Sequence, residues 1–132
     1  MDKKTEKIKL ALVEDDKLLS RILHEKLSSE GFEVLCAYNG RQGLSMVLKE
    51  RPDLVLLDVI MPVMDGREMV QKLREDEWGK TVPVIFLTNL DRVDILMKMD
   101  SRMFSVKDYI VKSDWKLEEV VEKIRKKLSQ KS

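Results

Sequence analysis

Short apolar runs alternate along the chain with longer segments in which apolar residues recur every three or four positions. The short runs are 8–13, 32–37, 54–57, 83–87 and 109–111. Runs of this length, rich in Val, Ile and Leu, predict buried β-strands. The run 54–57 is apolar at every position, which is typical of a central parallel strand that is covered on both faces.

The segments between and after these runs predict helices, because their apolar residues have helical spacing. The first helix is expected to end near Gly31, and the second, after a turn at Asn39-Gly40, is stopped by Pro52. A third helix is expected to start near Asp65-Gly66, and a fourth to cover 91–103. The expected inner stripes of the other helices are Leu19, Ile22, Leu23 and Leu27; Leu44, Val47 and Leu48; Met69, Val70 and Leu73; and Leu117, Val120, Val121, Ile124 and Leu128.

Five strands alternating with five helices predict an α/β fold with a parallel sheet, because parallel strands need crossover connections, and these are right-handed. We expect a doubly wound, flavodoxin-like sheet in the order 2-1-3-4-5, with helices on both faces. No linker, repeat or low-complexity segment divides the sequence. We therefore expect a single domain over 1–132, with its core at about 8–129, and no output domain.

Composition and charge exclude several classes of partner. The chain has 25 Lys and Arg and 24 Asp and Glu, so the signs almost cancel and nothing favours direct binding of nucleic acid. No apolar stretch approaches the roughly 18 residues that a membrane span needs, so we expect a cytoplasmic protein without membrane contact. The single cysteine, Cys36, rules out a disulfide within the chain and is expected to be a small buried hydrophobe.

Polar residues fall at the carboxyl ends of the predicted strands. Glu14 and Asp15 follow the first strand, and Asp58 follows the third. Thr88 ends the fourth strand and Lys112 follows the fifth. Because the carboxyl ends of parallel strands form the binding edge of an open sheet, we expect these five side chains to converge.

Three carboxylates crowded together repel one another unless a cation neutralises them. Mg²⁺, or Mn²⁺ in its place, prefers oxygen ligands and keeps several waters. We expect Asp15 and Asp58 to be direct ligands and Glu14 to act through water. The backbone carbonyl of Ile60 is a further candidate ligand.

Four segments of the sequence carry a resemblance to a known family. They are 13–16 (VEDD), 57–66 (LDVIMPVMDG), 86–88 (FLT) and 108–112 (DYIVK). In this order and at this spacing, they resemble the CheY-like receiver domains of response regulators, which act in two-component signalling. The resemblance covers essentially the whole chain.

The resemblance implies a phosphorylation switch. Asp58 would be the phosphoacceptor and would take its phosphoryl group from a phosphohistidine on a histidine kinase or a histidine phosphotransfer protein. Mg²⁺ and Lys112 would supply positive charge, because positioning and charge neutralisation accelerate phosphoryl transfer. Thr88 would hydrogen-bond the phosphoryl group, and Tyr109 would be the switch aromatic.

The resemblance also implies how the signal leaves the domain. Phosphorylation would alter a surface made by the fourth helix, the fifth strand and the fifth helix, for binding a downstream target protein or for relaying the phosphoryl group onward. The chain would be a signalling switch that catalyses its own phosphorylation and slow dephosphorylation, not an enzyme acting on other substrates. It would be a monomer or a phosphorylation-dependent dimer.

Two departures from the family pattern lead to specific expectations. Lys112 is followed by Ser113 where most receivers have proline, so we expect a trans peptide bond at this position. Ile60 and Leu90, two residues beyond Asp58 and Thr88, are apolar. We expect them to hinder attack of water on the acyl phosphate and so to give a long-lived phosphorylated state.

Two other functions compete with this interpretation. A phosphatase of the haloacid dehalogenase type also uses a strand-end aspartate, but it needs a second aspartate two positions on, where this chain has Ile60. A pseudo-receiver would use the fold for binding alone, and only the replacement at Ser113 favours it. Tyr109 also has a simpler interpretation, as a half-buried aromatic that serves only in packing.

Overall fold

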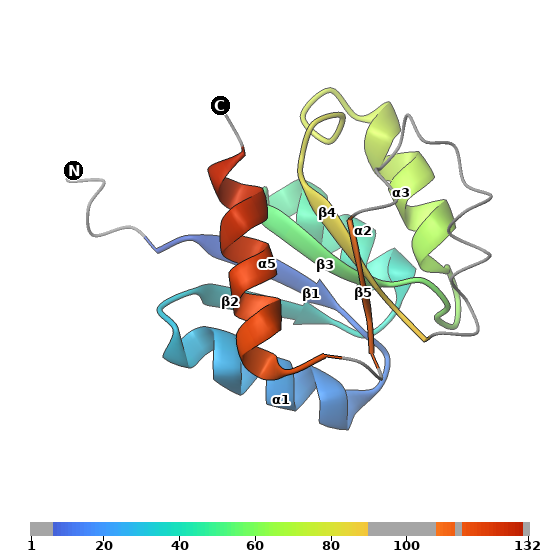
Figure 1. Cartoon of the computed structure of the whole chain (residues 1–132). Coiled ribbons are helices and arrows are strands. Elements are labelled where there is room, and N and C mark those ends of the chain that lie inside the picture. Colours follow the sequence, from blue (N-terminus) through green and yellow to red (C-terminus); the bar gives the residue numbers. More distant parts are fainter. Residues whose placement is uncertain (1–6, 90–107, 113–114, 131–132) are drawn as a thin grey trace.

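The computed structural model of the chain describes residues 7–89, 108–112 and 115–130 (Figure 1). Strands and helices alternate along it, as the apolar pattern predicts. In chain order the elements are β1 (Lys9–Val13), α1 (Lys17–Ser29), β2 (Glu33–Ala37), α2 (Gly40–Glu50), β3 (Leu54–Asp58), α3 (Gly66–Glu75), β4 (Val84–Thr88), β5 (Tyr109–Val111) and α5 (Leu117–Ser129). The helix expected over 91–103 lies outside the described residues.

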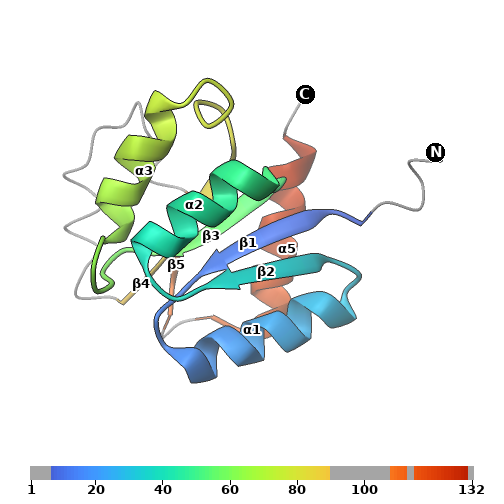
Figure 2. The same ribbon diagram turned by 180° about the vertical axis from the view of Figure 1, so that it is seen from behind.

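The five strands form one parallel sheet in the order β2-β1-β3-β4-β5, which confirms the predicted fold. Helices α1 and α5 cover one face of this sheet, and α2 and α3 cover the other (Figures 1 and 2). The carboxyl ends of all five strands therefore meet at one edge, between the two helical layers.

The described part of the chain contains no helix with the length and hydropathy of a membrane span.

Each face of the sheet has its own hydrophobic core. Ala11 and Val13 of β1 pack with α2 and α3 in the first core cluster, whereas Leu10 and Leu12 pack with α1 and α5 in the second. Two half-buried tryptophans follow the same division, with Trp78 on the first cluster and Trp115 on the second. Because side chains alternate along a strand, each buried strand serves both cores.

Polar side chains set the starts of three helices. Asp16, Asn39 and Asp65 are the N-caps of α1, α2 and α3, and each accepts a hydrogen bond from a backbone N–H of the first turn. The prediction of a turn at Asn39-Gly40 is therefore wrong, since Asn39 caps α2 and Gly40 is the first residue of that helix. A Cβ on Gly40 would collide with the backbone carbonyl of Met64, so the close approach of that loop requires glycine.

Ile22 and Cys36 are among the side chains that are less buried than the sequence pattern predicts. Ile22 was expected in the inner stripe of α1, but it is 40% exposed. Cys36 was expected to be buried, and it is only half-buried. The reason for Cys36 is its place on β2, which forms an edge of the sheet and has a neighbouring strand on one side only.

Candidate functional site

The sheet edge brings the predicted site residues to one region. Glu14 directly follows β1, Asp58 is the last residue of β3, and Lys112 directly follows β5. An open pocket of about 460 Å³ lies at this edge. It is lined by Glu14, Asp15, Asp16, Asp58, Ile60, Met61, Pro62, Asn89 and Lys112.

Three carboxylates gather in this pocket. Glu14, Asp15 and Asp58 each offer a carboxylate oxygen, and these oxygens lie within 4.8 Å of one another. Glu14 and Asp58 are buried, whereas Asp15 is exposed on the rim. The convergence predicted from the strand ends is therefore present in the structure.

Lys112 bridges the two buried carboxylates. Its Nζ lies 2.7 Å from Oε1 of Glu14 and 3.3 Å from Oδ2 of Asp58. The other carboxylate oxygen of Glu14 accepts the backbone N–H of Asp16 at 3.0 Å. Glu14 is thus held by a cation and a backbone donor, and it in turn orients Lys112 toward Asp58.

The surroundings of Asp58 favour its neutral form. Burial and, after it, the negative charge of Glu14 raise the pKa of Asp58 to about 7, although Lys112 acts in the opposite direction. For Lys112, burial alone would lower the pKa, but hydrogen bonding and charge attraction from Glu14, and then from Asp58, outweigh it and raise the pKa. Lys112 is therefore charged at neutral pH, whereas the pKa of Asp58 itself lies close to neutral pH.

The donor set fits a hard divalent cation. Oδ1 of Asp58 is buried and has no hydrogen-bond partner among the residues that the structure describes. A buried carboxylate oxygen without a partner is costly, and a hard cation would satisfy it while relieving the repulsion between the acids. Mg²⁺ takes one or two carboxylates together with waters, which matches an open pocket that has one exposed and two buried acids.

Thr88 and Tyr109 lie beside this pocket without lining it. Thr88 is fully buried, and its hydroxyl donates to the carbonyl of Asn89 at 3.2 Å. Its own carbonyl accepts the backbone N–H of Lys112 at 2.7 Å, which ties the end of β4 to the end of β5. Tyr109 is half-buried and packs against the first core cluster.

The loop after β3 shapes one side of the pocket. The N–H of Gly66 donates to the carbonyl of Val59 at 2.7 Å, and a Cβ at Gly66 would collide with the carbonyl of Asp58. Within the loop, the N–H of Met64 donates to the carbonyl of Pro62 at 2.8 Å across Val63, which has a φ of 71°. This is a γ-turn centred on a β-branched residue, a rare and strained conformation.

Sequence reasoning did not select Asp16, Met61, Pro62 and Asn89, which also line the pocket. All four lie inside or directly beside the segments already quoted, so their neighbourhood was visible in the sequence. The place of Asp16 in the pocket was harder to predict, because its side chain also caps α1. The peptide bond between Lys112 and Ser113 and the side chain of Leu90 lie outside the described residues.

Comparison with known proteins gives a consistent result. The family model described as "Response regulator receiver domain" matches residues 10–125. The chain is 38% identical over 112 residues, 85% of its length, to "Probable transcriptional regulator ycf27" of Galdieria sulphuraria. The match spans only 42% of that relative, so the chain covers about two fifths of its length.

Solved structures show the same architecture. The chemotaxis response regulator CheY4 of Vibrio cholerae superposes with a TM-score of 0.82 at 25% identity, covering 92% of this chain and 99% of that one. The receiver domain of the sensor histidine kinase PA1611 of Pseudomonas aeruginosa superposes with a TM-score of 0.77 at 24% identity, covering 94% of this chain and 99% of that one. The PA1611 structure holds a magnesium ion in its active-site cleft.

The fold and the site together define a doubly wound α/β domain with an acidic, lysine-bearing pocket at the carboxyl edge of its sheet. The match over residues 10–125 then gives the family. The chain belongs to the response regulator receiver domains of two-component signalling, which are signalling switches.

Proposed function

We propose that this receiver domain accepts a phosphoryl group on Asp58 from a phosphohistidine of a partner protein, in a reaction that depends on Mg²⁺. The observation that carries the proposal is the state of Asp58: a buried carboxylate with one unpartnered oxygen, beside two other acids and within 3.3 Å of Lys112 Nζ. Such a carboxylate is held in position for the reaction, and its buried oxygen stays without a partner until a cation binds.

The transfer is a displacement at phosphorus. A carboxylate oxygen of Asp58 attacks the phosphorus atom, the P–N bond to the partner's imidazole breaks, and the electron pair of that bond returns to the ring nitrogen. Lys112 is already placed between Asp58 and Glu14, so it lies where charge on the phosphoryl oxygens would develop. Hydrolysis later returns the carboxylate when water attacks the same phosphorus and releases inorganic phosphate.

Glu14, Asp15, Asp58 and the carbonyl of Ile60 would hold the cation in this proposal. When bound, Mg²⁺ neutralises the acids and the phosphoryl oxygens. The proximity of the three carboxylates within 4.8 Å supports this assignment. The magnesium ion in the PA1611 receiver domain, a protein with the same fold, also supports it.

The output side of the proposal rests on Thr88 and Tyr109. The hydroxyl of Thr88 donates to the carbonyl of the adjacent Asn89, and it could exchange this bond for one to a phosphoryl oxygen. Such an exchange would shift the end of β4 and with it β5, whose first residue is Tyr109. The readout surface would comprise the segment 91–103, β5 and α5, and would bind a downstream protein, a phosphotransfer partner or, after phosphorylation, a second receiver. These steps would take place in the cytoplasm.

The test is intact-mass spectrometry after incubation with acetyl phosphate and Mg²⁺. We expect one added phosphoryl group in the unmodified chain and none in Asp58→Asn or when EDTA replaces the metal. Asp53→Asn, which changes a half-buried aspartate at the opposite end of β3, is the matched control and should still be phosphorylated.

A purified phosphorylated histidine kinase domain provides the second donor. If neither donor labels the chain, while circular dichroism shows a folded protein, the proposal is wrong and a pseudo-receiver that only binds becomes the better function. Labelling that persists in Asp58→Asn would place the acceptor elsewhere. The decay of the labelled species without phosphatase then tests the expected long lifetime, and loss within seconds would contradict it.

A further inference from the structure

Strand β2 is an edge strand with a poorly protected centre. Within the described sheet it pairs with β1 alone, and its middle residues Val34, Leu35 and Cys36 are all half-buried. Proteins commonly protect such edges with lysine, proline, a bulge or a covering segment. The segment Glu33–Ala37 contains neither lysine nor proline, so this apolar edge is open to another strand.

The backbone of β2 has unused hydrogen-bonding groups on its outer side. The N–H of Glu33 and the carbonyl of Ala37 bond to the residues that flank β1, at 2.9 and 3.0 Å. Backbone groups alternate in direction along a strand, so those of Val34 and Cys36 point away from β1. Two N–H groups and two carbonyls therefore face outward in the arrangement to which an added strand binds.

A groove runs along this edge between the two helical layers. Figure 2 shows β2 at the edge of the sheet, with α1 on one side of it and α2 on the other. The groove has a volume of about 600 Å³. It is lined by Lys17, Ser20, Arg21 and His24 of α1, by Val34, Leu35 and Cys36 of β2, by Tyr38, and by Met46 of α2.

The charged side chains that line the groove are all positive. Among its nine lining residues, all within the described part of the chain, none carries a carboxylate, whereas Lys17 and Arg21 are exposed cations. Lys17 lies over the ring of Tyr38, with Nζ 5.6 Å from the ring centroid. A neighbouring depression of about 490 Å³ shares Met46 and adds Arg41 and Lys49, with Glu50 as its only acid.

Of the carboxylates around the groove, Glu50 and Glu25 do not cancel this charge, whereas Glu33, exposed at the start of β2, opposes it at that end of the strand. Glu50 is ion-paired with Lys9, at 3.5 Å. Glu25 lies 4.0 Å from Arg21, and both side chains are more than two thirds exposed, at 72% and 74%. An exposed pair at that distance is weak, so Arg21 is available to another anion.

We propose that this groove binds an extended acidic segment of a partner protein, which adds to the outer side of β2 as a sixth strand. Val34 and Cys36 pack toward the core beneath α1, and Ala37 toward the core beneath α2, so the side chains of an added strand would also alternate between the two walls. Acidic side chains on it would meet Lys17 and Arg21 on the α1 wall, and a longer segment would also reach Arg41 in the neighbouring depression. A second copy of this chain is the wrong occupant, because two copies would bring the same cations together.

The experiment uses two displayed libraries of peptides of about nine residues, enough to span a strand of this length. One library alternates Val, Ile or Leu with Asp or Glu, and the other alternates the same apolar residues with Lys or Arg. We expect enrichment from the acidic library only. The enriched peptide should bind about tenfold or more tightly than its lysine counterpart and should protect the amides of Val34 and Cys36 from hydrogen exchange.

Two variants test separately how the backbone of β2 and the charge of the groove contribute to peptide binding. Val34→Pro removes an outward N–H that β1 does not use, and Arg21→Glu reverses one wall charge. Each should weaken the peptide by about tenfold while circular dichroism still shows a folded chain. Lys72→Glu, on the exposed face of α3, should bind as the parent chain does. Asp58→Asn should also bind normally, which keeps this test independent of the phosphorylation proposal.

Several results would overturn the proposal. Failure of the acidic library to enrich, equal binding of the lysine peptides, or protection of amides elsewhere than on β2 would each do so. Displacement of the peptide by an oligothymidylate would indicate a nucleic-acid site instead. Dimerisation of the free chain that Val34→Pro abolishes, seen by sedimentation, would make a second copy the occupant.

Discussion

At the scale of single residues, the charged form of the buried Asp58 opposes folding. Asp58 and Glu14 are carboxylates with 2% and 0% exposure, and only Lys112 offsets them among the described side chains. The raised pKa of Asp58 means that its charged form is less stable in the folded chain than in the unfolded chain. The chain thus gives up stability to keep this acid where it lies.

The first prediction concerns pH. Because the pKa of Asp58 is raised to about 7, the folded state holds its proton more tightly, and the contribution of this residue to stability is lost as pH rises from about 4 to about 7. In EDTA at about pH 8, Asp58→Asn should therefore raise the unfolding free energy by about 1–3 kcal/mol, and the gain should vanish near pH 4. Urea denaturation of both proteins across this range measures the difference.

Added Mg²⁺ is the control for that experiment. It should stabilise the parent chain at about pH 8 and leave Asp58→Asn nearly unchanged, because the variant lacks one of the ligands. A variant that is less stable than the parent in EDTA would show that the charge of Asp58 is not a net cost.

The second prediction concerns Lys112. Lys112→Ala leaves Glu14 and Asp58 close together without their cation and should lower the unfolding free energy by about 3 kcal/mol at neutral pH. Lys80→Ala, which removes an exposed lysine 3.1 Å from Glu77, is the matched control and should cost less than about 1 kcal/mol. Equal losses in the two variants would mean that the buried ion pairs contribute no more than a surface pair.

At the scale of elements, the loop between β3 and α3 carries the clearest backbone strain. Val63 has a φ of 71° and is 68% exposed, so it adopts a conformation that suits glycine while it buries little surface in return. The turn holds Met64, whose carbonyl accepts the N–H of Gly40 at 3.0 Å. The strain is thus compensated by the contact between this loop and the start of α2.

Val63→Gly should therefore stabilise the chain by about 1 kcal/mol, because relief of the strain outweighs the extra freedom of glycine in the unfolded state. Val63→Ala, which keeps a Cβ at the same φ, is the comparison and should gain less. Thermal unfolding of the three proteins measures both effects. A Val63→Gly protein that melts below the parent would show that the exposed valine contributes packing that outweighs the strain.

The elements were largely predictable from sequence because apolar periodicity and burial have the same cause. Every predicted strand was found within one residue of its expected start, and Asp65-Gly66 does begin α3. The sequence predicts a turn at Asn39-Gly40, where the structure has the N-cap of α2, because an N-cap and a turn use the same residue types. Ile22 follows the helical period, yet it lies on the margin of the buried stripe and is exposed.

The site was predictable to a different degree. The convergence of Glu14, Asp15, Asp58 and Lys112 follows from topology, since strand order alone brings the strand ends together. The orientation of the Thr88 hydroxyl toward Asn89 and the ion pair between Lys112 and Glu14 depend on side-chain rotamers, which no sequence pattern encodes. The expected absence of an output domain stays a prediction, because the ycf27 relative extends well beyond the matched region.

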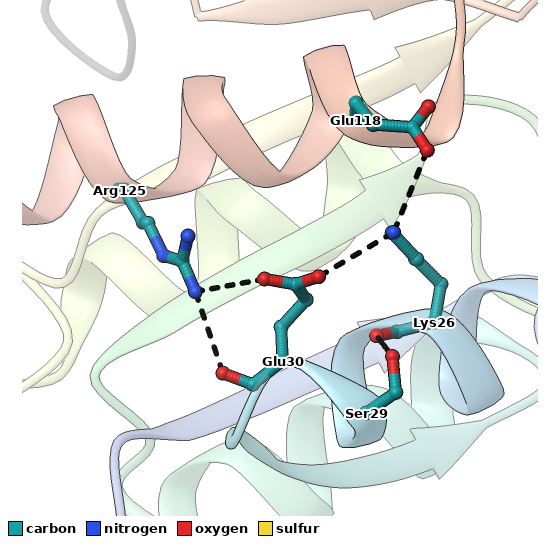
Figure 3. Close-up of polar contacts among 5 residues, drawn as sticks. All are labelled: Lys26, Ser29, Glu30, Glu118 and Arg125. Carbon is teal, nitrogen blue, oxygen red and sulfur yellow. Dashed lines mark hydrogen bonds and ion pairs between the residues drawn. The ribbon is translucent and has the colours of Figure 1, made fainter.

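At the scale of the whole molecule, an ion-pair cluster joins the first and last helices. Figure 3 shows Glu30, at the end of α1, between Lys26 of the same helix and Arg125 of α5. Arg125 Nη2 lies 3.0 Å from Oε1 of Glu30, and Lys26 Nζ lies 3.4 Å from Oε2 of Glu30 and 3.6 Å from Oε1 of Glu118. Arg125 also covers the ring of Phe32, with Cζ 5.6 Å from the ring centroid.

This cluster should stabilise the packing of α1 against α5 by a modest, salt-dependent amount. A double-mutant cycle with Glu30→Ala and Arg125→Ala should give a coupling of about 0.5–1 kcal/mol at low salt, reduced at about 1 M NaCl. The exposed pair of Arg21 and Glu25, within α1, is the control cycle and should couple more weakly. Coupling that does not change with salt would point to packing on Phe32 as the source.

The separation of the two tryptophans between the two cores makes the chain its own optical probe. Trp78 packs with the α2 and α3 layer and Trp115 with the α1 and α5 layer, so each indole responds to the looseness of one layer. Replacing either one by phenylalanine leaves a single tryptophan, which can be excited apart from the two tyrosines. Fluorescence quenching in the two single-tryptophan proteins would then reveal whether one layer of the sandwich loosens before the other when ligands bind or when the chain is heated.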